Sequence, residues 1–223
     1  MRYNLSDKEV HIPLGKIKLE GELVIPPNSK SLVIFSHGSG SSRFSTRNNF
    51  VARELQKQNI GTFLFDLLTR EEDELYSNRF NIDLLSERLV FVTNYIISLP
   101  QCTNLRVGYF GASTGAASAI RAAVALPKII ETLVSRGGRP DLAFESVPIL
   151  KAPTLLIVGE LDYDVLELNR KVYKALKCEK KLEVVPGATH LFEETGTLQE
   201  AALLARDWFS LYLQNTKMQQ SKI

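Results

Sequence analysis

The chain has 223 residues and a mass of 25.0 kDa, which suits one domain of α/β size better than two small domains. Its apolar fraction of 44% and charged fraction of 23% are those of an ordinary globular chain, which argues against intrinsic disorder. With 27 basic and 25 acidic residues the net charge is only +2, so we expect neither a nucleic-acid surface nor a polybasic membrane patch.

The longest apolar runs fall far short of the ~18 residues that a membrane span needs, so no membrane span is expected. The first residues carry no apolar stretch of the kind found in a secretory signal, which predicts a cytoplasmic protein. Only two cysteines occur, Cys102 and Cys178, and neither belongs to a C-x-x-C or Cys/His cluster. We therefore expect no disulfide framework, no zinc module and no other metal site.

The N-terminal region has the pattern of a two-stranded hairpin. Residues 17–25 alternate between apolar and charged side chains, which indicates a strand with one face in water. Val10 and Ile12 begin a similar alternation before a turn at Gly15. The pattern predicts an antiparallel hairpin that ends at Pro26.

Short apolar or β-branched runs, most of them without clean alternation, follow along the rest of the chain. Such runs are typical of strands buried on both faces of a parallel sheet. They lie at residues 32–35, 62–65, 106–110, 131–134, 154–158 and 182–185. Between them, residues 85–96, 113–126 and 198–212 have apolar or alanine residues at helical spacing.

Strands that alternate with helices indicate right-handed βαβ units. The sequence therefore predicts an α/β fold, with one doubly wound, mostly parallel sheet, helices on both faces and the N-terminal antiparallel hairpin. We expect a single domain over residues 1–215 and a polar tail over residues 216–223. Ligands of such sheets bind beyond the carboxyl ends of the strands, so the functional residues are expected there.

The run at 106–110 is followed by Gly111-Ala112-Ser113-Thr114-Gly115 and then a predicted helix, which is G-x-S-x-G in a strand–turn–helix setting. The serine of such a turn has a strained backbone, and glycines at 111 and 115 let strand and helix approach closely. Its hydroxyl then lies at a helix N-terminus, where free N–H groups stabilise negative charge. Ser113 is therefore the candidate nucleophile, against the simpler interpretation of a serine N-cap.

A serine nucleophile needs a base, and the chain has only three histidines. His190 lies on a loop after the last predicted strand, at the carboxyl end of the sheet, and is the candidate base. His11 lies in the hairpin, remote from that end. His37 directly follows the strand at 32–35, and we expect it to shape the loop there, with the role of base as its alternative.

The base in turn needs an acid that orients it. The strand at 154–158 is followed by three carboxylates, and we favour Asp162 because the loop needs a few residues to turn toward His190. Glu160 leaves the strand too early, and Asp164 can instead cap a helix that begins near Val165. Asp141, at the neighbouring strand end, is a fourth candidate.

The order of the candidates along the chain, Ser113, Asp162 and His190, is the order found in α/β-hydrolases. Acyl transfer also needs donors for the oxyanion. One is the N–H of Thr114, directly after the nucleophile. The second should come from the glycine-rich loop after the strand at 32–35, where we favour the N–H of Ser39 with Gly40 as the alternative.

The sequence resembles the dienelactone hydrolase-like group of the α/β-hydrolases over nearly its whole length. The segments that carry the resemblance are residues 37–42, 111–115, 159–162 and 186–192. It implies Ser113 as nucleophile, Asp162 as acid and His190 as base, with no cofactor. The enzymes that give the group its name have a cysteine nucleophile where this chain has serine, so a general esterase or acylhydrolase is expected.

Further candidates for contact with the substrate are His37, Gly38, Gly40 and Arg136. Arg136 and Arg139 follow a predicted strand end, where they can bind a substrate carboxylate or pair with an acid such as Asp141. No long apolar insertion interrupts the predicted strands, which favours a short acyl group.

The sequence thus predicts a serine hydrolase that cleaves small carboxylic esters or thioesters through an acyl-enzyme. Two alternatives remain, a peptidase on the same fold and a hydrolase-fold scaffold that only binds. The expected partner is a small-molecule ester, with no nucleic acid and no membrane span. The sequence is also compatible with a homo-oligomer.

Overall fold

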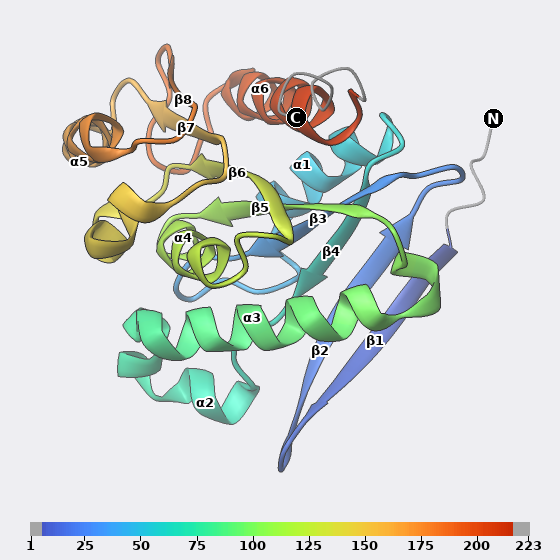
Figure 1. Ribbon diagram of the computed structural model, residues 1–223. Coiled ribbons are helices and arrows are strands. Elements are labelled where there is room, and N and C mark those ends of the chain that lie inside the picture. The colour runs from blue at the N-terminus through green and yellow to red at the C-terminus, as the bar shows by residue number, and fades with distance from the viewer. Residues whose placement is uncertain (1–5, 216–223) are drawn as a thin grey trace.

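The computed structural model describes residues 6–215, and its centre is a single eight-stranded sheet (Figure 1). The strands are β1 (Ser6–Leu14), β2 (Ile17–Ile25), β3 (Ser31–Ser36), β4 (Gly61–Phe65), β5 (Arg106–Ala112), β6 (Ile130–Arg136), β7 (Thr154–Gly159) and β8 (Lys180–Val185). Their spatial order is β1-β2-β4-β3-β5-β6-β7-β8. Each predicted strand is present, within one or two residues of its expected position.

The sheet is parallel except at its N-terminal edge. Strands β1 and β2 pair antiparallel, and β2 also pairs antiparallel with β4. From β4 through β8 every neighbouring pair is parallel, so the carboxyl ends of these strands lie along one edge. The predicted hairpin and the predicted mostly parallel sheet are both confirmed.

Six α-helices accompany the sheet within residues 6–215. They are α1 (Thr46–Gln56), α2 (Arg70–Glu74), α3 (Ile82–Ser98), α4 (Gly115–Ala125), α5 (Tyr163–Ala175) and α6 (Thr197–Leu213). Three stretches of 3₁₀ helix lie between them, η1 (Tyr76–Phe80), η2 (Pro100–Cys102) and η3 (Pro140–Ile149). Figure 1 shows α3 and α4 on one side of the sheet and α1 and α6 on the other.

Two hydrophobic cores, one on each face, hold these layers together. Neighbouring residues of a buried strand belong to different cores, as Ile34 and Phe35 of β3 do. Tyr109 of β5 likewise packs on the side of α3 and α4, and Phe110 on the side of α1 and α6. Strands covered on both faces need apolar side chains at every position, which is why the sequence shows runs without alternation.

The structure differs from the sequence-based expectation at α5. This helix begins at Tyr163, not near Val165, so Asp164 lies inside the first turn and Asp162 holds the N-cap position. The Asp162 side chain makes no capping hydrogen bond to this helix. Asp164 is therefore not the cap of this helix, and the carboxylate at the cap position is free for another contact.

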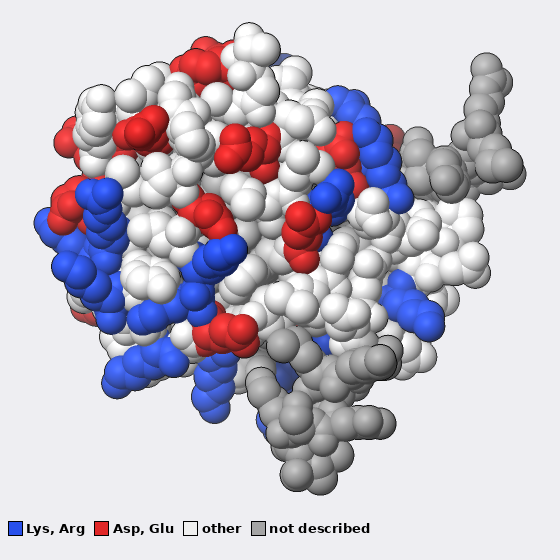
Figure 2. All heavy atoms as spheres, turned by 90° about the horizontal axis from the view of Figure 1, so that it is seen from above, with Lys and Arg blue, Asp and Glu red and all other residues white. Residues whose placement is uncertain are grey.

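The surface has mixed charge. On the face shown in Figure 2, Lys and Arg side chains gather at the left, with Asp and Glu side chains beside them. No helix among the described residues is long and apolar enough to cross a membrane. The predicted tail, residues 216–223, lies outside the described residues.

Candidate active site

The turn between β5 and α4 holds Ser113 in a strained conformation. Its φ of 50° lies in the left-handed region that residues with a side chain rarely adopt. The flanking glycines permit this turn: a Cβ on Gly111 would lie 2.5 Å from the Ala116 Cα, and one on Gly115 only 2.1 Å from the Ser36 carbonyl oxygen. The sharp strand–turn–helix geometry expected of G-x-S-x-G is therefore present.

The end of β3 also packs against this turn. The hydroxyl groups of Ser36 and Ser118 share a buried hydrogen bond of 2.7 Å that joins β3 to α4. A Cβ on Gly38 would lie 2.9 Å from the Ser113 Cβ, so the loop after β3 runs directly beside the candidate nucleophile. A side chain at 38 would crowd the serine, which explains why glycine is needed at this position.

His190 and Asp162 meet across two neighbouring loops. The His190 Nδ1 lies 2.7 Å from the Asp162 Oδ2, and the aspartate side chain is only 13% exposed. The loops after β7 and β8 are joined by the Leu161 N–H, which donates to the Ala188 carbonyl at 2.9 Å. This arrangement leaves the Nε2 of His190 available to a further group.

The other three acids considered for this role lie elsewhere, and two of them have partners of their own. Asp141 forms a two-pronged ion pair with Arg139, with N–O distances of 2.9 and 2.8 Å. Glu160 accepts a hydrogen bond from the Gly187 N–H at 2.9 Å, and Asp164 lies in the first turn of α5. Of the four carboxylates, the structure therefore brings only Asp162 to His190.

Ser113 and His190 line the same pocket, which has a volume of about 270 Å³. Its other lining residues come from the loop after β3, the start of α1, the ends of β5 and β6 and the loop after β8, and they are Gly38, Ser39, Ser41, Ser45, Arg47, Asn48, Ala112, Arg136, Gly137 and Leu191. Among the described residues no hydrogen bond joins the Ser113 hydroxyl to His190. The lining contains two arginines and no carboxylate.

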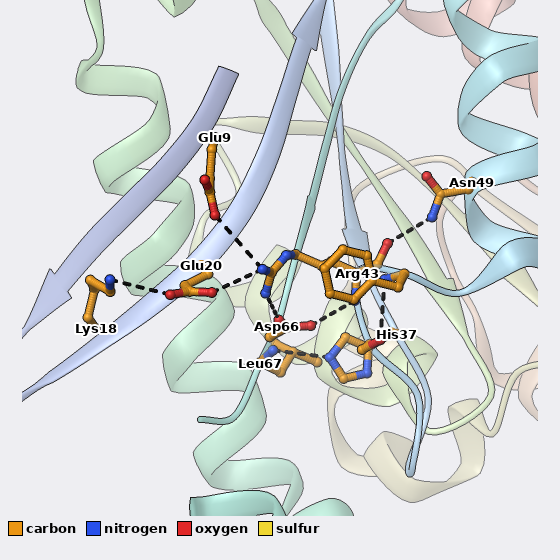
Figure 3. A network of polar contacts seen from close by, with 10 residues as sticks. Glu9, Lys18, Glu20, His37, Arg43, Asn49, Asp66 and Leu67 are labelled. Atoms are coloured by element: carbon orange, nitrogen blue, oxygen red, sulfur yellow. Dashed lines mark hydrogen bonds and ion pairs between the residues drawn. The ribbon is translucent and has the colours of Figure 1, made fainter. Parts of the chain in front are cut away.

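An ion-pair network fixes the loop after β3 to the sheet (Figure 3). The backbone N–H of Arg43 donates to Asp66 Oδ1 at 2.7 Å, and its guanidinium bonds the other oxygen of Asp66. The same guanidinium reaches Glu20 of β2 at 3.0 Å. The Asn49 amide donates to the Arg43 carbonyl at 2.8 Å. Together these contacts hold the loop between β2, the end of β4 and α1.

His37 belongs to this support and does not line the pocket that contains Ser113 and His190. Its Nε2 accepts a hydrogen bond from the Leu67 N–H at 3.1 Å, so its Nδ1 carries the proton and donates to the Gly38 carbonyl at 3.0 Å. Burial lowers the pKa of His37 below its ordinary value of 6.5. Both ring nitrogens are occupied by backbone groups, which leaves none for a substrate or for the role of base.

The two expected oxyanion donors differ in their surroundings. Among the described residues no group accepts a hydrogen bond from the Thr114 N–H. The Ser39 N–H donates to the Thr114 hydroxyl at 2.8 Å, so it is already occupied in this structure. The loop and the turn are thereby joined beside Ser113.

Comparison with known proteins places this geometry in a family. No protein-family model matches the chain. The crystal structure of dienelactone hydrolase from Anabaena variabilis superposes with a TM-score of 0.91 and is 47% identical, over 95% of this chain and 100% of that one. The chain belongs to the dienelactone hydrolase-like family of α/β-hydrolases.

More distant structures share only the fold with this dienelactone hydrolase-like protein. Est1E from Butyrivibrio proteoclasticus is 18% identical with a TM-score of 0.78, over 90% of this chain and 97% of that one. An esterase of Pyrococcus furiosus is 19% identical with the same TM-score, over 94% and 92%. The predicted α/β-hydrolase fold is confirmed.

Two curated Mycobacterium tuberculosis proteins, from two strains, are 50% identical over 206 residues, and both are named "Putative phosphoribosyl transferase". The match covers 92% of this chain but 46% of each of those proteins. The dienelactone hydrolase-like chain thus spans about half the length of these curated relatives.

Sequence reasoning missed several residues of this dienelactone hydrolase-like site. Arg47 and Asn48 reach the pocket from the start of α1, a helix that the apolar pattern does not reveal. Arg43 and Asp66 support the loop from two segments 23 positions apart. A charged residue inside a loop of glycines and serines is the only signal that could have drawn attention to Arg43.

The half-buried, neutral His37 gives the family member a pH-dependent stability. Because the pKa of His37 is lowered on folding, the unfolded chain binds more protons, and this part of the unfolding free energy is present above pH 6.5 and lost as the pH falls below it. A protonated ring could not accept the Leu67 N–H. Urea unfolding should therefore show a lower free energy at pH 5.5 than at pH 7, with a smaller decrease in His37→Gln.

The exposed His11 of β1 provides the matched control, because His11→Gln should keep the pH dependence of the parent. An equal decrease between pH 7 and 5.5 in the parent and in His37→Gln would contradict this role of His37.

Proposed function

We propose that this chain is a serine hydrolase that cleaves small carboxylic esters or thioesters through an acyl-enzyme. The observation that carries the proposal is the shared pocket of Ser113, on its strained turn, and His190, whose other ring nitrogen is bound to Asp162. Membership of a hydrolase family supports it. The three roles and the ester bond are the parts we propose.

The hydrogen bond to Asp162 determines what His190 can do. With the carboxylate at Nδ1, the neutral ring carries its proton on Nδ1 and keeps a lone pair on Nε2. Nε2 then takes the proton of the Ser113 hydroxyl as the oxygen attacks the ester carbonyl, and returns it to the leaving alkoxide or thiolate. Substrate must bring Ser113 and His190 into hydrogen-bond contact, as catalytic hydrogen bonds commonly tighten in the bound complex.

The carbonyl oxygen becomes negative in the tetrahedral intermediate and needs donors. The Thr114 N–H, at the N-terminus of α4, is the first that we propose. For the second we propose the loop after β3. The Ser39 N–H would have to release the Thr114 hydroxyl before it could donate to the oxyanion. The Gly40 N–H is the alternative donor in the same loop. Water then hydrolyses the acyl-enzyme with His190 as its base.

The name of the curated relatives describes proteins about twice as long as the matched segment. Because the matched segment has the fold of hydrolases, we assign the transferase in that name to the part of those proteins that this chain does not match. Neither the peptidase nor the binding scaffold is favoured by a specific contact in the pocket.

Ser113→Ala tests the nucleophile. Hydrolysis of p-nitrophenyl acetate should fall by about 10³-fold or more, since the three residues act as a unit. A fluorophosphonate probe should label the parent covalently and leave Ser113→Ala unlabelled, as seen by intact-protein mass spectrometry. Ser98→Ala, at an exposed position in α3, is the control and should behave as the parent. A parent that takes up no label would favour the binding scaffold.

Asp162→Asn tests the acid. If this carboxylate fixes the tautomer of His190, turnover should fall by about 10⁴-fold. Asp141→Asn is the matched control, because Asp141 is paired with Arg139 and should matter far less. Circular dichroism should show that both variants are folded. A greater loss in Asp141→Asn than in Asp162→Asn would contradict the proposed role of Asp162 and place the acid after β6.

The size of the pocket tests the proposed substrate class. A volume of about 270 Å³ is at or below the lower end for sites that take drug-sized ligands. Each methylene of a long acyl chain left in water forgoes ~0.8 kcal/mol of burial. For p-nitrophenyl esters of increasing length, kcat/KM should peak at about two to four acyl carbons. Ser113→Ala serves as the blank. A maximum of kcat/KM at about eight or more acyl carbons would reject the small acyl site.

A further inference from the structure

The loop that carries His190 is closed by a carboxylate four residues further along the chain. Glu194 accepts a hydrogen bond from the Thr189 N–H at 3.0 Å and a second one from the Thr189 hydroxyl at 2.5 Å. Each oxygen of the carboxylate takes one of these two bonds. Thr189 directly precedes His190 in the chain. The carboxylate therefore holds the stretch of backbone from which the imidazole projects.

The backbone of His190 has no hydrogen bond of its own. Among residues 6–215 neither its N–H nor its carbonyl is bonded, and its ring is bound to Asp162 alone. Its position is therefore set by the two residues before it. The Leu161 N–H bonds the Ala188 carbonyl at 2.9 Å, and the carboxylate of Glu194 holds the next residue. These contacts determine where the imidazole is mounted, whereas Asp162 determines how the ring is turned.

The turn that Glu194 closes contains a strained residue. Phe192 has a φ of 55°, in the left-handed region that bulky residues rarely adopt, and it is only 2% exposed. Its N–H donates to the Thr189 carbonyl at 3.2 Å. Such a conformation persists only where contacts on several sides fix it. Thr189 supplies three of them, because its N–H, its hydroxyl and its carbonyl are all bonded within this turn.

Glu194 is itself anchored to α6. Its carbonyl accepts hydrogen bonds from the Thr197 N–H at 3.1 Å and from the Thr197 hydroxyl at 2.8 Å. Thr197 is the first residue of α6, which packs on the sheet through buried residues such as Ala201 and Phe209. A carboxylate mounted on a packed helix gives the loop a fixed point, which a freely rotating surface glutamate could not.

The bonds from Thr189 also keep this carboxylate charged. The Thr189 hydroxyl, and then the Thr189 N–H, hold the pKa of Glu194 below its ordinary value of 4.5. An ionised acceptor makes the stronger kind of hydrogen bond. The adjacent Glu193 has a different contact, an ion pair with Arg47 at 3.1 Å in which the glutamate side chain is 66% exposed. The sequence does not distinguish the two glutamates, whereas the structure gives only Glu194 a contact with the residue before His190.

We propose that Glu194 is a positioning residue: by holding Thr189 it keeps the imidazole of His190 in the orientation that proton transfer requires. In that orientation Nδ1 meets Asp162, which leaves Nε2 for Ser113. Glu194 does not line the pocket, so it acts on the imidazole only through the loop. Outer contacts of this kind orient the reacting groups, and a misplacement of about 1 Å can cost about 10²-fold in rate. The effect on hydrolysis rests on the proposed function, whereas the orientation of the ring does not.

Steady-state kinetics with p-nitrophenyl acetate give the first test. Glu194→Ala should lower kcat by about tenfold or more, because the imidazole is less well placed. KM should stay near that of the parent, since Glu194 does not line the pocket. Glu194→Gln keeps one acceptor oxygen for Thr189 and should recover part of kcat. Glu200→Ala removes an exposed carboxylate in the first turn of α6 and is the matched control, with the kcat of the parent.

Nitrogen-15 NMR of the histidine rings gives a second test, which needs no reaction. The chain has three histidines, so His11→Gln and His37→Gln identify the signals of the other two. At about pH 8, where an ordinary histidine is neutral, the parent should show His190 with its proton on Nδ1. Glu194→Ala should change that signal to a mixture of both tautomers, and Glu200→Ala should not. A purely structural role of Glu194 would lower the melting temperature and leave the tautomer as in the parent.

The two tests separate the positioning role from the reaction. A mixed tautomer in Glu194→Ala, in a protein that hydrolyses no ester, would uphold the role of Glu194 and reject the proposed function. Ester hydrolysis that depends on Ser113, with the tautomer of the parent in Glu194→Ala, would do the reverse, whatever the value of kcat. If Glu194→Ala does not fold, Thr189→Val takes its place in both tests. That variant removes only the hydroxyl donor and should show smaller changes in the same direction.

Discussion

The contact of α4 with the end of β3 is the constraint on which the whole site depends. At Gly115 the space for a side chain is taken by the carbonyl oxygens of Ser36 and His37, at 2.1 and 2.5 Å from where a Cβ would lie. With the helix start so close to the strand end, the connection from β5 has room for only two residues, and Ser113 takes a positive φ. The cost of such a conformation, of order 1–3 kcal/mol, is met by the packing around it. Serine, helix N-terminus and the loop after β3 therefore form one rigid unit.

The loop after β3 is held by the ion pairs of Arg43 and by the neutral His37. Arg43 connects it to Asp66 and Glu20, and the adjacent Leu67 N–H is bound to His37 (Figure 3). Backbone N–H groups stabilise an oxyanion only if they are already oriented, since reorientation during the reaction would cost part of the gain. These contacts lie outside the pocket, yet they fix the backbone of the loop from which we propose the second oxyanion donor.

Local patterns were enough to predict the strands, the hairpin and the turn at Ser113, because each depends on residues close together in the sequence. The apolar pattern does not reveal helix α1, because only three of its buried residues, Val51, Ala52 and Leu55, are apolar and they lie within a polar segment. Loop lengths alone favour Asp162 over the three other acids in the sequence. The structure adds the contact of Asp162 with His190, and it pairs Asp141 and Glu160 with other groups. The sequence could not show whether His37 contacts the substrate, because both of its ring nitrogens bond to backbone atoms, which carry no sequence signal.

Arg136 shows a further limit of sequence reasoning. Its distinctive feature is that no carboxylate among the described residues pairs with its guanidinium, and the sequence does not reveal this. Arg136 lies five positions before Asp141 and is easily taken for its partner, but Arg139 occupies that carboxylate. A charge buried without a counter-ion is a cost to folding, and a pocket that tolerates it is optimised for something other than stability. Strands β5 and β6 are in register at Ala112 and Arg136. The pairing of β5 with β6 thus fixes the backbone of Arg136 beside the strained serine.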